Sequence, residues 1–287
     1  MKKVLAICLG LIVLASWAWA EPILTEQVKT VPANNLEIGL ACSYGVDTWD
    51  WEDASQAGSS KVSLTTVQVP IKYGVNDKLQ LNLNIPYRAW DSSIEFGGAT
   101  ATADDSGIGQ VSVGAKYALN DMLAVGLDIQ TPTGDVDKGL GEGTNVGVLL
   151  ACQKEFKPVI IHGNLGYLYK SEYEDEHDVK HDPADPIIIR AAVEYPLNML
   201  TPFAEAQVQF LGKSKTAGID IPDSSGSTID FLVGSQYQKD NLKAKLGLEF
   251  AAGDEDLRGG TFQFYDSWDW KIIASVSYMF NLMGGGK

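Results

Sequence analysis

The stretch LQLNLNIPYRAW, residues 79–90, alternates apolar and polar side chains almost without error. Leucine, isoleucine and tyrosine hold the odd positions up to 87, whereas glutamine, asparagine and arginine hold most of the even positions. Because successive side chains of a strand point to opposite faces, these residues are predicted to form a strand with one apolar and one polar face. The apolar face of such a strand meets a protein core in a soluble sheet and lipid in a membrane β-barrel.

The first twenty residues narrow the choice to exported proteins. MKKVLAICLGLIVLASWAWA begins with two lysines, continues with an apolar run and ends in Ala18-Trp19-Ala20. This is the pattern of a secretory signal peptide with a small-residue cleavage site, so residues 1–20 are predicted to be removed. The rest of the chain has no apolar run of the about 18 residues that a membrane helix needs. We therefore expect a soluble exported β-protein or an outer-membrane barrel.

The charge of the chain excludes several classes of partner. The whole sequence carries −15, and without residues 1–20 there are 20 basic and 37 acidic residues, a net charge of −17. Such an acidic chain is not expected to bind nucleic acid or a bare anionic lipid surface. Only Cys42 and Cys152 remain after cleavage, and both are predicted to face outward on distant strands, so no disulfide scaffold is expected.

The alternation of residues 79–90 recurs in eleven other segments along the chain. Each has about the length, roughly 9–11 residues, that crosses a bilayer as a tilted strand. Short turns and long polar loops alternate between them, which is typical of outer-membrane barrels. The sequence predicts an all-β, transmembrane, antiparallel up-and-down β-barrel of about 12 strands, with short periplasmic turns and long extracellular loops. The segments are 35–45, 63–75, 79–90, 108–119, 122–131, 143–154, 158–170, 187–195, 203–211, 228–238, 242–251 and 268–280.

This assignment also divides the chain. Residues 21–34 are predicted to be a short periplasmic N-terminal segment, residues 35–281 the barrel and residues 282–287 a C-terminal tail. Aromatic side chains on the apolar faces gather near both strand ends, as in the two aromatic girdles of membrane barrels. The girdle of the long-loop end is predicted to contain Tyr44, Tyr87, Tyr167, Tyr169, Phe210, Phe250, Trp268 and Trp270.

The polar faces should line the lumen, and their charges nearly cancel. Eight basic and seven acidic residues fall on the inward positions, whereas a strongly selective pore would carry a ring of one sign. Pairing between neighbouring strands is the favoured interpretation, since buried charges are usually paired. The predicted lumen-lining residues are Lys72, Asn82, Asn84, Arg88, Lys116, Asp128, Arg190, Glu194, Glu205, Lys243, Lys245 and Glu249.

Three further features of the sequence are candidates for a metal site, an enzymatic residue or a gap in the barrel wall. The acidic loop 171–186 contains His177 and His181, which are weak candidates for a divalent metal, but its acids lack an ordered ligand spacing, so a solvated loop is favoured. His162 has no serine nucleophile beside it, and a structural role in the wall is favoured over an enzyme. Pro70 and Pro86 lie in two adjacent predicted strands, where missing amide donors would leave either a lateral gap or ordinary bulges.

Four pieces of the sequence together resemble a known family. They are IKYGVNDKLQLNLNIPYR (71–88), SGIGQVSVGAKYAL (106–119), DIQTPTGD (128–135) and HGNLGYLY (162–169). The chain resembles the outer-membrane proteins of the meta-pathway of phenol degradation, and is similar at a distance to the long-chain fatty acid transporters. The resemblance implies a barrel that takes up aromatic or other hydrophobic compounds. The fatty acid transporters carry an N-terminal plug, for which residues 21–34 are expected to be too short.

The sequence thus predicts a bacterial outer-membrane channel for passive uptake of small, hydrophobic or aromatic compounds, without a cofactor and without enzymatic activity. A narrow porin for polar solutes and a structural barrel with a blocked lumen remain alternatives. The expected partners are outer-membrane lipid and lipopolysaccharide, the barrel assembly machinery and the small-molecule substrate.

Overall fold

The computed structural model describes residues 23–52, 57–221, 224–252 and 268–282. The predicted signal peptide, residues 1–20, and all but the first residue of the predicted tail lie outside these ranges. In the part of the chain that is described, no helix is long and apolar enough to cross a membrane.

One antiparallel sheet curls round and closes on itself, as predicted. It closes because β17 pairs with β1, while β2 pairs with both β1 and β3. Since β4 and β5 are two parts of one wall strand, the barrel described here has twelve strands around its circumference. Its strands are β1 (Asn35–Glu52), β2 (Ala57–Gly74), β3 (Leu79–Phe96), β4 (Ala99–Ile108), β5 (Ser112–Asn120), β6 (Leu123–Gln130), β7 (Asn145–Phe156), β8 (Val159–Lys170), β11 (Ile187–Glu194), β12 (Leu200–Leu211), β15 (Gly226–Lys239), β16 (Leu242–Ala251) and β17 (Trp270–Asn281).

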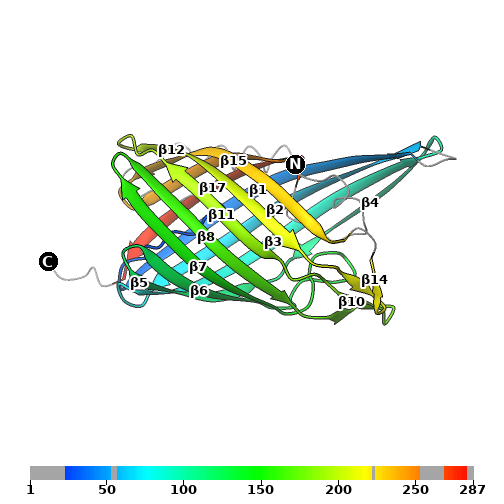
Figure 1. The fold of residues 1–287 in the computed structure, drawn as a ribbon, viewed down its shortest axis with the longest axis horizontal. Helices are drawn as coiled ribbons and strands as arrows, with labels where there is room; N and C mark the ends of the chain where they lie inside the picture. The colour runs from blue at the N-terminus through cyan, green and yellow to red at the C-terminus, as the bar shows by residue number, and fades with distance from the viewer. Residues whose placement is uncertain (1–22, 53–56, 222–223, 253–267, 283–287) are drawn as a thin grey trace.

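The two ends of the barrel differ, as Figure 1 shows. At the turn end, tight turns are closed by asparagine side chains. Asn76 Oδ1 accepts hydrogen bonds from the amides of Lys78 and Leu79 at 2.8 and 2.9 Å, and Asn120 makes the equivalent bonds after β5. Such turns are a normal use of asparagine, because its short side chain can replace a backbone acceptor. The opposite end, called the loop end, carries the long connections.

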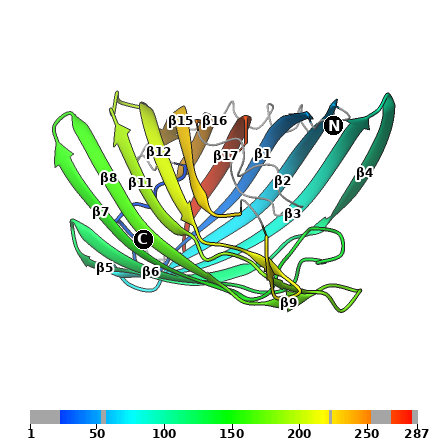
Figure 2. The ribbon, with the colours of Figure 1, turned by 45° about the vertical axis from the view of Figure 1, so that its right-hand side comes forward.

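A small second sheet lies among these connections at the loop end. It consists of four short strands in the order β14-β13-β10-β9. Figures 1 and 2 place this small sheet beyond the ends of the barrel strands. Its strands are β9 (Tyr173–Glu174), β10 (Lys180–Asp182), β13 (Lys215–Thr216) and β14 (Ile219–Asp220).

The barrel wall has apolar side chains outside and polar side chains inside. On β8 the outward Leu165 and Tyr169 are each 50% exposed, whereas the inward His162 and Asn164 are 2% and 5% exposed. A soluble protein buries its apolar side chains instead, so this arrangement fits a wall that faces lipid. Buried polar side chains of the interior include Gln80, Lys116, Glu194, Glu205, Gln207, Asp230, Gln236 and Glu249.

Two predicted loops are in fact strands. Residues 46–61 and 91–107 were expected to be polar loops, but β1, β2, β3 and β4 continue through most of them and form hairpins. Figure 1 shows these hairpins projecting past the barrel at the loop end. The prediction ended the strands where apolar outward residues end, yet a ladder of backbone hydrogen bonds does not need apolar side chains to continue.

The fourth wall strand is interrupted between β4 and β5. Ile108 lies opposite Tyr87 and Ser112 lies opposite Asn84, so four steps along this strand match three steps along β3. This is the count of a β-bulge. Thr133 completes the interruption, because its hydroxyl accepts from the amide of Val111 at 2.8 Å and donates to the carbonyl of Gly109 at 2.9 Å. The Pro132-Thr133-Gly134 motif therefore braces a break in the wall.

The two prolines leave the seam between β2 and β3 intact. That ladder runs without a shift from the Gly58–Phe96 pair to the Gly74–Gln80 pair. The carbonyl of Pro86 accepts from Gly109 at 2.9 Å, so the missing donor of Pro86 faces the β4–β5 break. Pro70 lies where the β1–β2 ladder omits Gly39 and Leu40. The alternative of a lateral gap between the second and third strands is therefore not found, because each proline points its nitrogen at its other neighbour.

Candidate functional site: the barrel lumen

Three cavities in the lumen are bordered by described residues. The loop-end chamber, of about 500 Å³, lies beneath the small sheet, and the central chamber, of about 360 Å³, lies against β1, β2, β16 and β17. The third, of about 350 Å³, is called the glycine-lined chamber because Gly126, Gly147 and Gly166 border it on β6, β7 and β8. Arg88 borders both the loop-end and the central chamber, and Arg190 borders both the central and the glycine-lined chamber.

Some of the predicted lumen-lining residues border these chambers, and others are buried within the barrel wall. Lys72, Arg88, Arg190, Lys245 and Glu249 border the central chamber. The glycine-lined chamber is bordered by Asn82, Lys116, Asp128 and again Arg190. Glu194, Glu205 and Lys243 are buried within the wall, and the Oδ1 atom of Asn84 is buried without a hydrogen-bond partner among the described residues.

Several interior charges lie in short ion pairs. Lys271 Nζ is 2.9 Å from Glu249 on the neighbouring strand, and Lys243 Nζ is 3.0 Å from Glu37. His162 Nε2 also lies 3.2 Å from Glu194, with both side chains almost completely buried, and this contact is an ion pair only when the imidazole is protonated. Such contacts hold the wall in a fixed geometry, because a buried charge is costly unless it is paired.

The N-terminal segment lies inside the barrel. One oxygen of the Glu205 carboxylate accepts from the amide of Ile23 at 2.6 Å, and the other accepts from Leu24 and Thr25 at 2.9 and 2.7 Å. Further along, Asn164 Oδ1 accepts from the amide of Glu26 at 2.7 Å. Residues 21–34 were expected to be a short periplasmic segment, but residues 23–28 lie along the inner wall of the barrel. The polar wall supplies hydrogen-bond partners for an extended backbone, which a count of residues could not reveal.

The segment continues along the wall to the first strand. Lys116 Nζ donates to Glu26 Oε2 at 3.1 Å and to the carbonyl of Gln27 at 3.0 Å. Val28 is 1% exposed and packs with Ala124 and Ala151, whose small side chains leave room for it. The segment thus fills the lumen near the turn end. The barrel wall binds both its backbone, by hydrogen bonds, and its side chains, by an ion pair and apolar contacts.

The mouth at the loop end is also narrowed. Trp90 points inward, and its indole nitrogen donates to the carbonyl of Lys138 at 2.7 Å. Lys138 belongs to the connection between β6 and β7, in which Leu140 is 1% exposed. Residues 136–139 of this connection border the loop-end chamber, so it covers part of the mouth.

The predicted metal candidates lie in this region but do not converge. His181 stacks on Tyr173 with ring centroids 5.0 Å apart, and its Nε2 lies 3.0 Å from Asp175 Oδ2. The side chain of His177 is 76% exposed, 3.9 Å from Glu176. The hydrogen bond from His181, followed by one from the amide of Val179, lowers the pKa of Asp175 to about 2. Burial, with Glu142 and Asp175 nearby, raises the pKa of Tyr173 to about 12.

Comparison with known proteins connects this geometry to a family. The family model described as "Putative MetA-pathway of phenol degradation" matches residues 24–264. The chain belongs to this family. The family resemblance that the four sequence segments indicated is thereby confirmed. None of the curated proteins compared by sequence matches the chain.

The fold of this family member is also found in a solved outer membrane channel. The COG4313 outer membrane channel from Pseudomonas putida F1 aligns with a TM-score of 0.69 and 14% identity, over 91% of this chain and 100% of that chain. The Pseudomonas putida toluene transporter TodX aligns with a TM-score of 0.42 and 12% identity, over 88% and 90% of the two chains. A Pseudomonas aeruginosa FadL homologue aligns with a TM-score of 0.43 and 8% identity, over 87% and 90%.

Sequence reasoning missed the inward aromatic and apolar side chains of this family member. Trp268 was assigned to the outward girdle, but it is 4% exposed and borders the central chamber. It lies over Gly45, where a Cβ atom would overlap its ring. Position 268 precedes β17, so the strand alternation does not reach it. By contrast, Trp90 shares the even positions of Gln80 and Arg88, and its inward direction was available from the alternation.

Proposed function

We propose that the chain is an outer-membrane channel for passive uptake of small hydrophobic, mainly aromatic, compounds. In this proposal the turn end faces the periplasm and the loop end faces the exterior. The apolar outer wall supports the membrane location, and the description of the family supports aromatic cargo. The partners would be lipid and lipopolysaccharide around the wall, the barrel assembly machinery and the cargo itself.

The observation that carries the proposal is an apolar strip inside the polar lumen. Leu168 on β8 and Ile188 on β11 border both the loop-end chamber and the glycine-lined chamber. Leu149 extends the strip in the glycine-lined chamber, and Leu211 extends it in the loop-end chamber. A pore for polar solutes gains nothing from such side chains, whereas an apolar molecule gains free energy by leaving water along them.

Two other functions have specific support. The charged side chains of the central chamber favour a narrow porin for polar solutes, and the filled turn end favours a barrel with a blocked lumen. Measurements of toluene uptake and of ion conductance distinguish the three candidate functions. A hydrophobic channel raises toluene uptake by intact cells with little ion conductance in planar bilayers, a porin conducts steadily in planar bilayers, and a blocked barrel does neither.

The test fills the glycine-lined chamber without touching a charge. Gly147→Leu should reduce toluene uptake several-fold, because the new side chain projects into that chamber beside Leu168. A Cβ atom at Gly147 would meet its nearest neighbour, Leu168, at 3.4 Å, an ordinary contact, so the variant should fold. Gly212→Leu is the matched control, since a Cβ atom there has no neighbour within 4 Å. Equal uptake by both folded variants would refute passage through this chamber.

A further inference from the structure

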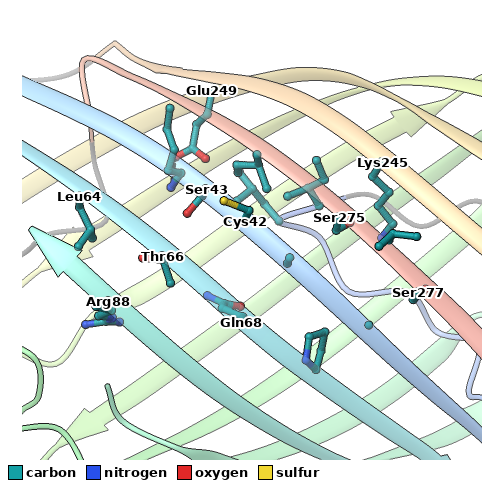
Figure 3. A pocket seen from close by; sticks show the side chains of 18 of the residues that line it. Cys42, Ser43, Leu64, Thr66, Gln68, Arg88, Lys245, Glu249, Ser275 and Ser277 are labelled. Atoms are coloured by element: carbon teal, nitrogen blue, oxygen red, sulfur yellow. Dashed lines mark ion pairs between the residues drawn. The ribbon is translucent and has the colours of Figure 1, made fainter. Parts of the chain in front are cut away.

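The central chamber is positively charged in a strongly acidic protein. The whole chain carries a net charge of −15. Among the described residues that border the chamber, five are cationic and only Glu37 and Glu249 are acidic. Figure 3 shows Arg88, Lys245 and Glu249 around this pocket. The five cationic residues are Lys72, Arg88, Arg190, Lys245 and Lys271.

The two carboxylates of the chamber already have cationic partners. Glu249 lies 2.9 Å from Lys271, and Glu37 lies 3.0 Å from Lys243, which is not among the bordering residues. Asp230, buried behind the chamber, is connected through Gln207, which accepts from Arg190 Nε at 2.6 Å and donates to Asp230 at 3.2 Å. Glu205, the next inward acid, binds the N-terminal segment. Cationic residues therefore outnumber acidic residues among those that border the chamber.

Arg88 supplies an independent observation. Its Nε atom is buried and has no hydrogen-bond partner among the described residues. The residue lies between the loop-end chamber and the central chamber, because it borders both. A guanidinium group binds a carboxylate through two parallel hydrogen bonds, and a buried donor without an acceptor is costly. An anionic ligand that passes from the loop-end chamber into the central chamber would meet this group at the boundary.

Part of the remaining chamber wall is apolar, and the rest is uncharged and polar, formed by Ser43, Thr66, Gln68, Gln207, Ser275 and Ser277. Ile23 and Leu24 of the N-terminal segment, Leu64 and Pro70 on β2, and Ile273 on β17 all border it. The volume, about 360 Å³, lies within the range of ligand pockets, roughly 300–1,000 Å³. A ligand that matches both parts of the wall has an apolar body and one negatively charged end.

We propose that the central chamber binds small aromatic monocarboxylates, with the carboxylate held by Arg88 and the neighbouring lysines. This inference rests on the proposed channel function and names an ionised class of cargo for it. A neutral hydrocarbon in the same chamber would cover the buried Nε of Arg88 without supplying an acceptor, which is unfavourable. An aromatic monocarboxylate supplies a carboxylate that binds the cationic side chains, and its ring contacts the apolar side chains.

The experiment measures binding to the purified barrel by titration calorimetry at pH 7, with benzoate and its neutral isostere benzamide as probes. Wild type should bind benzoate at least tenfold more tightly than benzamide. Arg88→Gln should remove most of this preference, and Arg88→Lys, which keeps the charge without the fork, should retain part of it. Lys154→Gln, at the turn end, is the control and should bind like wild type.

Folding is checked for every variant by heat-modifiable gel mobility, and Lys245→Met replaces Arg88→Gln if the latter does not fold. Equal affinity of wild type for both probes, or an unchanged preference in a folded variant, would overturn the inference. Toluene uptake by wild type separates this failure from that of the proposed function. If toluene enters but benzoate shows no preference, only the inference fails; if toluene does not enter, the proposed function fails.

Discussion

At the scale of single residues, Glu205 shows how one inward carboxylate organises a segment far away in sequence. Its two oxygens accept three backbone amides that are about 180 residues distant along the chain. The strand alternation was sufficient to predict that Glu205 faces inward. Its partners could not be predicted, because residues 21–34 carry no pattern that specifies where their backbone amides will bind.

Replacing this carboxylate should release the beginning of the segment. In Glu205→Gln one oxygen becomes an NH₂ group, which cannot accept the amides of Leu24 and Thr25. Losing hydrogen bonds to a charged acceptor costs about 2 kcal/mol, or roughly thirtyfold in local opening. Hydrogen exchange at residues 23–25 should accelerate by that factor. Glu249→Gln, whose partner is Lys271, should leave these amides protected, and equal exchange in both variants would contradict this role of Glu205.

At the scale of elements, the sequence predicted which strands exist better than where they end. Twelve wall strands were predicted, but the hairpins of β1–β2 and β3–β4 extend well beyond the apolar part of the strands. The break at Gly109–Val111 was also not predicted. A bulge depends on the hydroxyl of Thr133, which lies in the following loop, and alternation along one strand contains no information about that contact.

The small sheet at the loop end should lose order in acid. Hydrogen bonding lowers the pKa of Asp175 from its ordinary value of 3.8 to about 2. Because the folded pKa is depressed, the stabilisation is complete above about pH 4 and is lost as the pH falls toward 2. Hydrogen exchange at residues 173–182 should therefore accelerate between pH 4 and pH 2, relative to the intrinsic rate, while the barrel strands stay protected.

The neutral substitution Asp175→Asn should reproduce this loosening at pH 7. Asp178→Asn in the same turn is the matched control, because the contacts of His181 and Val179 go to Asp175. If the exchange of residues 173–182 is independent of pH in this range and unchanged in Asp175→Asn, the contact between Asp175 and His181 does not order the sheet.

At the scale of the whole molecule, the polar interior and apolar exterior were predictable because lipid and lumen impose opposite demands on alternate residues. The contents of the lumen were not predictable in the same way. The chambers depend on where residues 23–34 and the connection around Leu140 fold inward, and these segments have no periodic pattern. The sequence therefore predicted the wall of the candidate site, but not the space that remains inside it.

The orientation of the wall can be tested with one substitution at two adjacent positions of β7. Leu150 is 44% exposed on the outer face, whereas Leu149 borders the glycine-lined chamber, whose wall also includes Glu26 and Asp128. Arginine on the lipid face near the midplane costs about 2–4 kcal/mol, and arginine in a polar lumen costs less. Leu150→Arg should therefore reduce the assembled, heat-modifiable fraction in the membrane strongly, and Leu149→Arg should reduce it little. Equal loss in the two variants would show that the outward and inward faces have been assigned wrongly.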